Sequence, residues 1–207
     1  MCPSSVAPCP SGTNVTFFLE QNNALVIFYH QYYELFTSAL VTDYALDAAF
    51  NAIAVLVIDR ITYDTMNKPT YLLVFFLTAI FGNLLTLLWG PNYASAGASG
   101  GIFGVFAAIL SYEWAQQRKI DSVPLAFFLL IFVGSSILAD VNWVAHVGGA
   151  IGGFIAGPLL SRMAQSRQKE TGTEVAASDP RLDLLATAII FLIGIASVAQ
   201  FLIFAAL

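Results

Sequence analysis

Six long apolar segments fill most of this 207-residue chain. They occupy residues 38–61, 71–89, 96–114, 123–139, 141–160 and 184–207. A membrane-spanning helix needs about 20 predominantly apolar residues, and these segments have about that length. Charged residues make up 10% of the chain, far below the roughly 25% of soluble domains. We therefore predict an all-α, polytopic membrane bundle of about six transmembrane helices, embedded in a lipid bilayer.

The composition excludes several kinds of partner and cofactor. A net charge of -5 argues against nucleic acid, which favours a basic surface. The two histidines, His30 and His146, are too few and too far apart in sequence to predict a metal site. We expect no cofactor. Cys2 and Cys9 form a disulfide or remain free thiols, depending on which compartment holds the N-terminal tail.

We predict four regions along the chain. Residues 1–37 read as an N-terminal tail followed by an aromatic external loop at the membrane surface. Residues 38–162 form the membrane core, residues 163–182 a polar cytoplasmic linker, and residues 183–207 an additional C-terminal transmembrane helix.

The positions of Lys and Arg predict the orientation of the chain in the membrane, because cytoplasmic loops are enriched in both. All eight Lys and Arg residues lie at the end of the first, third or fifth segment or after it, and the loops around 90–95 and 140 have none. They are Arg60, Lys68, Arg118, Lys119, Arg162, Arg167, Lys169 and Arg181. This alternation predicts three cytoplasmic loops in a multi-pass protein. We take the plasma membrane as its location because the chain shows no targeting segment.

A serine and a histidine each open one of these segments among glycines. Ser99 lies in G-A-S-G-G-I-F-G at 97–104, and His146 lies in A-H-V-G-G-A-I-G-G at 145–153. Ser99 stands 19 residues before Arg118, and His146 stands 16 residues before Arg162. At about 1.5 Å rise per residue, these spacings are roughly 28 and 24 Å. We therefore expect both side chains at similar depth in the outer half of the bilayer.

Two interpretations of these stretches remain open from the residues alone. A serine is activated when a base takes its proton, and histidine is the usual base near neutral pH. Alternatively, both stretches are only packing surfaces, because small residues four positions apart let membrane helices approach closely. Ionisable groups inside membranes tend to be functional, which favours a dyad. The glycines that have this four-residue packing spacing are Gly97/Gly101, Gly100/Gly104 and Gly149/Gly153.

Residues 97–101 also match G-x-S-x-G, the nucleophile elbow of soluble α/β-hydrolases. That motif requires a buried strand before the serine. Here a short Gly/Pro/Asn/Ser loop in a membrane chain precedes it, so we reject the elbow.

Three stretches together resemble the rhomboid family of intramembrane serine proteases. G-A-S-G with F-G at 97–104 is similar to that family's G-x-S-G motif. A-H-V-G-G with the glycine at 153 is similar to its A-H-x-x-G-x-x-x-G segment. F-T-S-A-L at 36–40, followed by F-N at 50–51, is similar to its passage from the first external loop into the next helix. The resemblance covers about residues 30–162.

The resemblance implies a role for each matching residue. Ser99 would be the nucleophile and His146 the general base, with no third member. The backbone N–H of Ser99 and the side chain of Asn51 would stabilise the oxyanion. Phe103 matches the aromatic position that supports the histidine ring. The matching glycines are Gly97 and Gly100 in the serine motif and Gly149 and Gly153 in the histidine segment.

The chain departs from the family pattern in three places. The family usually has a histidine four residues before the asparagine, where this chain has Asp47, and an ionised carboxylate there would repel the developing negative charge. Tyr33 and Glu34 replace a usual Trp-Arg pair in the external loop. The first helix of the family is absent from the sequence before residue 20, and the sixth segment is then an extra C-terminal helix.

These observations predict an intramembrane serine endopeptidase that cleaves peptide bonds in or near transmembrane segments of protein substrates. The second hypothesis is a catalytically inactive rhomboid-like protein that binds membrane clients, which Asp47 and Glu34 favour. A small transporter is a weaker third, because it would need a broken helix and a charged site at the membrane midplane.

Overall fold

The computed structural model describes residues 15–42, 44–62, 65–117, 119–120, 122–137, 141–171 and 180–206. Most of the predicted N-terminal tail, with Cys2, Cys9 and their possible disulfide, lies outside these residues, as does Arg118. The long helices are α4 (Ala45–Thr62), α5 (Lys68–Thr86), α6 (Ser99–Gln117), α7 (Ser122–Ile137), α8 (Trp143–Thr171) and α9 (Pro180–Ala206). The predicted all-α bundle is confirmed.

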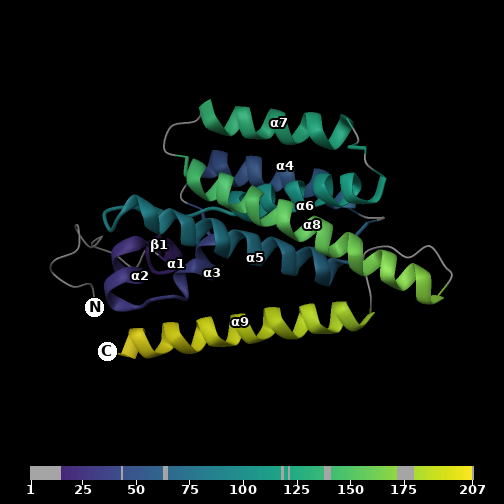
Figure 1. The fold of residues 1–207 in the computed structure, drawn as a ribbon. Coiled ribbons are helices and arrows are strands. Elements are labelled where there is room, and N and C mark those ends of the chain that lie inside the picture. Colours follow the sequence, from purple (N-terminus) through teal and green to yellow (C-terminus); the bar gives the residue numbers. More distant parts are fainter. Residues whose placement is uncertain are drawn as a thin grey trace.

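Helix α6 forms the core of the bundle. Up to Ser111 its sequence is apolar or small on every face, which is typical of a helix surrounded by others, and every residue from 100 to 111 is buried. Helices α4, α5 and α8 pack around it. Helices α7 and α9 lie on opposite outer sides of the bundle (Figure 1).

Three of the described helices are long and apolar enough to cross a membrane by themselves. They are α5 with the turn that follows it (Lys68–Trp89), the first part of α8 (Trp143–Ser166) and most of α9 (Pro180–Ile203). Helix α9 is the least buried of the three, because only 11% of its most apolar 18-residue stretch is buried inside the protein. Its exposed leucines and isoleucines, together with Phe191 and Val198, suit contact with lipid.

The residues before α4 fold into a compact outer segment. It contains the helices α1 (Val15–Leu19), α2 (Asn23–Tyr29) and α3 (Glu34–Thr37), the strand β1 (Gln21–Asn22) and the 3₁₀ turn η1 (Ser38–Leu40). Strand β1 pairs antiparallel with β2 (Ala94–Ser95), with Gln21 opposite Ser95. Buried amides attach the segment to the end of α5: Asn23 donates to the carbonyls of Thr86 and Gly90.

Helix α9 is fastened to the rest of the protein by polar contacts at both ends. Near its start, Asp183 accepts hydrogen bonds from Asn67 (2.7 Å) and Thr70 (2.9 Å) at the start of α5. Near its end, Gln200 accepts from the backbone N–H of Tyr33 at 2.7 Å and donates to the carbonyl of His30 at 2.8 Å. The C-terminal helix therefore braces the outer segment directly.

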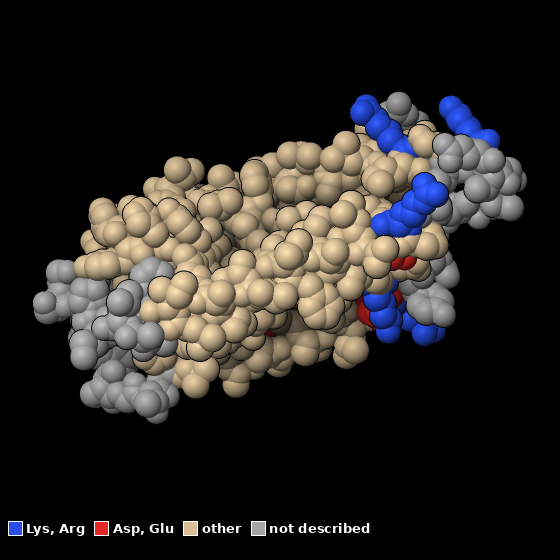
Figure 2. Space-filling view, turned by 90° about the horizontal axis from the view of Figure 1, so that it is seen from below, with Lys and Arg blue, Asp and Glu red and all other residues tan. Residues whose placement is uncertain are grey.

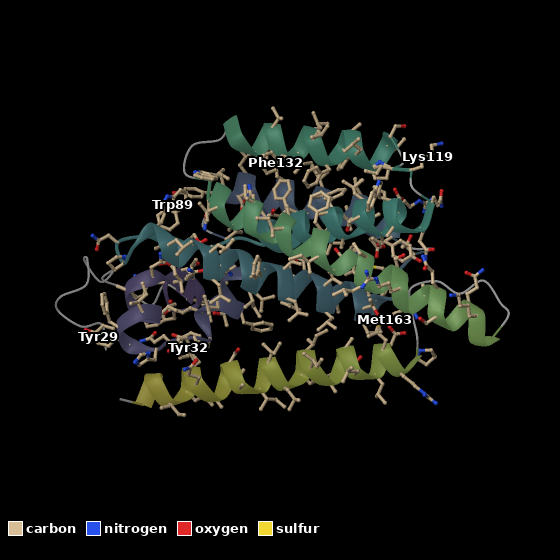
Figure 3. The ribbon with its side chains drawn as sticks, viewed as in Figure 1. Tyr29, Tyr32, Trp89, Lys119, Phe132 and Met163 are labelled. Atoms are coloured by element: carbon tan, nitrogen blue, oxygen red, sulfur yellow. The ribbon has the colours of Figure 1, made fainter. Side chains whose placement is uncertain are left out.

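The two ends of the bundle differ in their side chains. On the face shown in Figure 2, the Lys and Arg side chains gather at one end. Figure 3 places Lys119 at that end and Tyr29, Tyr32 and Trp89 at the opposite end. Trp89 also contacts the ring of Trp143, with centroids 5.3 Å apart. Aromatic rings gathered at one end are typical of a membrane–water interface.

Two elements differ from the sequence-based expectation. The third segment becomes helical only at Ser99, and Gly97 precedes it with a φ of 147°. Gly97 and Gly101 therefore do not form a helix-packing pair. Helix α8 continues to Thr171, so the first part of the predicted linker is helical. Polar residues with high helix propensity, such as Gln165 and Gln168, extend the helix beyond its apolar part.

Glu34 is a buried carboxyl in the outer segment, ahead of the long helices. It has no exposed surface. Its Oε2 accepts from the backbone N–H of Asn22 at 2.7 Å, and its Oε1 has no hydrogen-bond partner among the described residues. Burial raises the pKa of Glu34 to about 8, the nearby charge of Glu20 adds to this, and the Asn22 hydrogen bond opposes it. The folded protein therefore holds this carboxyl in its neutral form near pH 7.

This raised pKa predicts a pH-dependent stability. Because the folded state binds the Glu34 proton more tightly than the unfolded chain, stability should fall as pH rises from about 4.5 to about 8 and then level off. The total loss of folding free energy over this pH range should be no more than a few kcal/mol, since each pKa unit corresponds to about 1.4 kcal/mol. Thermal unfolding in detergent between pH 5 and pH 9 measures it. The slope should disappear in Glu34→Gln and persist in Asp59→Asn, an exposed carboxyl on α4; an unchanged slope in Glu34→Gln would contradict the assignment.

Candidate active site

Ser99 is the first residue of α6. The preceding turn is fixed by Gly97, whose N–H donates to the carbonyl of Ser38 at 2.9 Å. At a φ of 147°, a residue with a Cβ would be strained. The first N–H groups of a helix have no partner within it, so the N–H of Ser99 is available beside its own hydroxyl. Ser99 is partly exposed.

His146 lies in the first turn of α8, and Asn142 holds that helix start in place. The Asn142 side chain accepts from the N–H of Ala145 at 3.0 Å, which caps the helix. It also donates to Thr86 Oγ1 at 3.0 Å and to Ser95 Oγ at 2.9 Å. One amide therefore connects the start of α8 to the end of α5 and to β2. His146 itself is buried, with 3% of its surface exposed.

The two predicted residues meet directly. His146 Nε2 lies 2.7 Å from Ser99 Oγ, within hydrogen-bond distance. For this imidazole to take the serine proton, Nε2 must be the unprotonated nitrogen and act as the acceptor. The pair then has the arrangement of a nucleophile beside its general base.

Glycines allow this approach of α6 to α8. A Cβ added to Gly149 would collide with the carbonyl oxygen of Gly100, and one added to Gly153 would collide with the carbonyl oxygen of Gly104. The two backbones are thus in contact over two turns below the dyad. Without a hydrophobic driving force between helices in lipid, close contact of this kind holds membrane helices together.

Phe103 lies one turn after Ser99 and faces the histidine. The two ring centroids are 4.5 Å apart, with the planes inclined by 42°. Phe103 is 1% exposed and also meets Phe128 and Phe132 of α7 edge-on. Figure 3 shows Phe132 pointing from α7 toward the rest of the bundle. Phe103 thus restricts the orientation of the imidazole ring and shares the contact with α7 with Phe106.

Asn51 is joined to the site through Asp47. Asn51 Nδ2 donates to Asp47 Oδ2 at 2.9 Å, and Thr42 Oγ1 donates to the same oxygen at 2.7 Å. A Cβ added to Gly97 would lie 3.4 Å from Asp47 Oδ2 and 3.7 Å from Ser99 Oγ. Asp47 and the Ser99 hydroxyl therefore border the same small space, and Asn51 lies one helical turn beyond Asp47.

Sequence reasoning missed two features of this site. The link from Asp47 to Asn51 has a sequence signal, because residues four apart on a helix are neighbours. The Asn142 contacts have a weaker sequence signal, which is an asparagine just before the start of a helix. Among the described residues, no cluster of three or more His, Cys, Asp or Glu side chains has a geometry suited to a metal ion.

Comparison with known proteins adds a family match. A model of the rhomboid domain matches residues 29–163. The chain is 27% identical to the rhomboid protease GluP of Bacillus subtilis over 153 residues, which are 72% of this chain and 29% of that protein. It is 28% identical to the putative rhomboid protease YdcA of the same organism, over 66% of this chain and 71% of YdcA. It is 30% identical to the mitochondrial RHOMBOID-like protein 6 of Arabidopsis thaliana, over 47% of this chain and 34% of that protein.

Proposed function

The chain belongs to the rhomboid family, and from that premise we propose that it is an intramembrane serine endopeptidase with Ser99 as nucleophile and His146 as general base. The observation that carries the proposal is the 2.7 Å separation of Ser99 Oγ and His146 Nε2. Packing alone would not require a polar pair at the point where two glycine-rich helices begin.

Acylation would start with attack of Ser99 Oγ on the scissile carbonyl carbon while His146 Nε2 takes the hydroxyl proton. The negative charge formed on the carbonyl oxygen would be stabilised by the N–H of Ser99 and by the Asn51 amide. The C–N bond then breaks, and His146 returns the proton to the departing amine. An acyl group remains on Ser99.

Deacylation would repeat these steps with water as the nucleophile. Water attacks the ester carbon, His146 takes its proton, and the Ser99 Oγ–acyl bond breaks as the proton returns to the serine. The partial exposure of Ser99 supports access of water to this position.

The proposed substrates are transmembrane segments of other proteins. The rhomboid family and the apolar helices make the chain an integral membrane protein. We propose the plasma membrane as its location and the extracytoplasmic side as the side that the dyad faces. The proposed orientation rests on Lys119, which lies at the end away from the helix starts that carry the dyad. Lys119→Cys in a Cys2→Ala/Cys9→Ala background, probed from each side with an impermeant maleimide, reports the orientation.

A second candidate is a rhomboid-like protein that binds membrane clients without cutting them. The observation that favours it is Asp47, a carboxylate bordering the same space as the Ser99 hydroxyl. A negative charge there opposes formation of an oxyanion.

One experiment separates the two candidates. Purified protein in detergent is treated with a fluorescent fluorophosphonate, with Ser99→Ala as the control. We expect the wild type to be labelled and the variant not, because only an activated serine displaces fluoride at a useful rate. A folded wild type that stays unlabelled would favour the client-binding protein.

A further inference from the structure

We propose that Asp47 is a positioning residue for the oxyanion site, which acts by fixing the orientation of the Asn51 amide. This inference rests on the proposed function. It also reverses the expectation that a carboxylate at this position only opposes catalysis.

The argument starts from the chemistry of the two side chains. An amide presents a donor NH₂ on one side and an acceptor oxygen on the other, and the two are easily exchanged by rotation. An ionised carboxylate is an acceptor only. Asp47 Oδ2, 2.9 Å from Asn51 Nδ2, therefore binds the NH₂ side of Asn51 and excludes the flipped rotamer.

The orientation matters because Nδ2 carries two hydrogens. One is used by Asp47, and the second remains to donate to an oxyanion. In the flipped rotamer, the Asn51 carbonyl oxygen would take the place of this donor and repel the developing charge. A fixed donor that needs no reorganisation during the reaction is what makes oxyanion stabilisation effective.

Asp47 is itself held in position. Thr42 Oγ1, three residues before the start of α4, donates to the same Oδ2 at 2.7 Å. Two donors on one oxygen spread its negative charge, which reduces its repulsion of an oxyanion. The pair of contacts thus connects the Asn51 amide, through Asp47, to a residue outside the helix.

The test measures phosphonylation of Ser99 by a rhodamine fluorophosphonate, in which the Oγ–P bond forms, the P–F bond breaks, fluoride leaves and His146 takes the serine proton. The full chain in detergent is used, and the maximal rate is separated from the apparent affinity. Loss of an oxyanion donor lowers the catalytic rate by about 10²–10³-fold, and we expect Asn51→Ala to lower the maximal rate of phosphonylation by a factor in that range. Asp47→Ala should lose about 10–100-fold in maximal rate with little change in affinity, since a misaligned donor retains part of its effect.

Two comparisons separate positioning from a merely structural role. Asp47→Asn keeps an acceptor oxygen but can also turn its NH₂ toward Asn51, so it should recover only part of the rate lost in Asp47→Ala. In the double variant Asp47→Ala/Asn51→Ala, the rate should equal that of Asn51→Ala alone, because Asp47 acts through Asn51. Asp59→Asn, a neutralised carboxylate near the far end of α4, should label like wild type.

The outcomes are distinct. If the folded wild type is not labelled, the proposed function fails before this inference is reached. If the wild type is labelled and Asp47→Ala labels equally fast or faster, the inference is overturned. Additive losses in the double variant would overturn it as well.

Discussion

Ser99→Ala and His146→Ala should each lower the rate of peptide-bond hydrolysis by at least about 10⁴-fold, and the double variant should be no slower than either single variant. The two side chains share one hydrogen bond of 2.7 Å. Removing the base leaves a serine that keeps its proton, and removing the serine leaves a base with nothing to activate. Residues that act as one unit show this strong non-additivity.

The measurement uses a single-span reporter protein that the wild type cleaves after both are reconstituted in liposomes. Ser122→Ala and His30→Asn are matched controls, because both residues lie in exposed positions; asparagine tolerates the positive φ of residue 30. Thermal unfolding of each variant separates lost chemistry from lost structure. Losses that add in the double variant would show that the two residues act independently and would contradict a dyad.

The sequence allowed the helical membrane fold to be predicted because its signals are local. Length and apolarity identify helices such as α5 and α9 without knowledge of their neighbours. Ser99 and His146 could be paired for a related reason: regular helices convert sequence distance from the basic loops into depth in the membrane. Their catalytic roles remain predictions that the labelling experiment tests.

Other parts of the site could not be predicted because they depend on side-chain direction and on contacts between distant segments. The sequence shows Asp47 near Asn51 but does not show that the carboxylate binds the amide and Thr42. Helix α9 is apolar on most faces, so no pattern in it selects α5 as its neighbour. Its contact with the outer segment depends on individual side chains, the Gln200 amide and the Phe201 ring that meets Tyr33.

Gly149→Ala and Gly153→Ala should both destabilise the protein, and Gly149→Ala should have the larger effect on the active site. Each new Cβ would meet a backbone carbonyl oxygen of α6, which cannot rotate away. Overpacking of this kind costs about 1–3 kcal/mol, occasionally more. Gly194→Ala on α9 is the matched control, because no atom in the described part of the chain lies within 4 Å of its added Cβ and alanine favours a helix more than glycine does.

The difference between the two variants follows from their distance to the dyad. Gly149 lies three residues after His146, on the next turn of α8, whereas Gly153 lies one turn further away. Pushing α6 and α8 apart at Gly149 should lengthen the Ser99–His146 contact beyond hydrogen-bond distance, and strong hydrogen bonds end near 3.2 Å. Fluorophosphonate labelling should therefore fall much more in Gly149→Ala than in Gly153→Ala, while both lower the melting temperature in detergent. Equal labelling of all three alanine variants would mean that the glycines serve packing alone and that the dyad geometry does not depend on the contact between these helices.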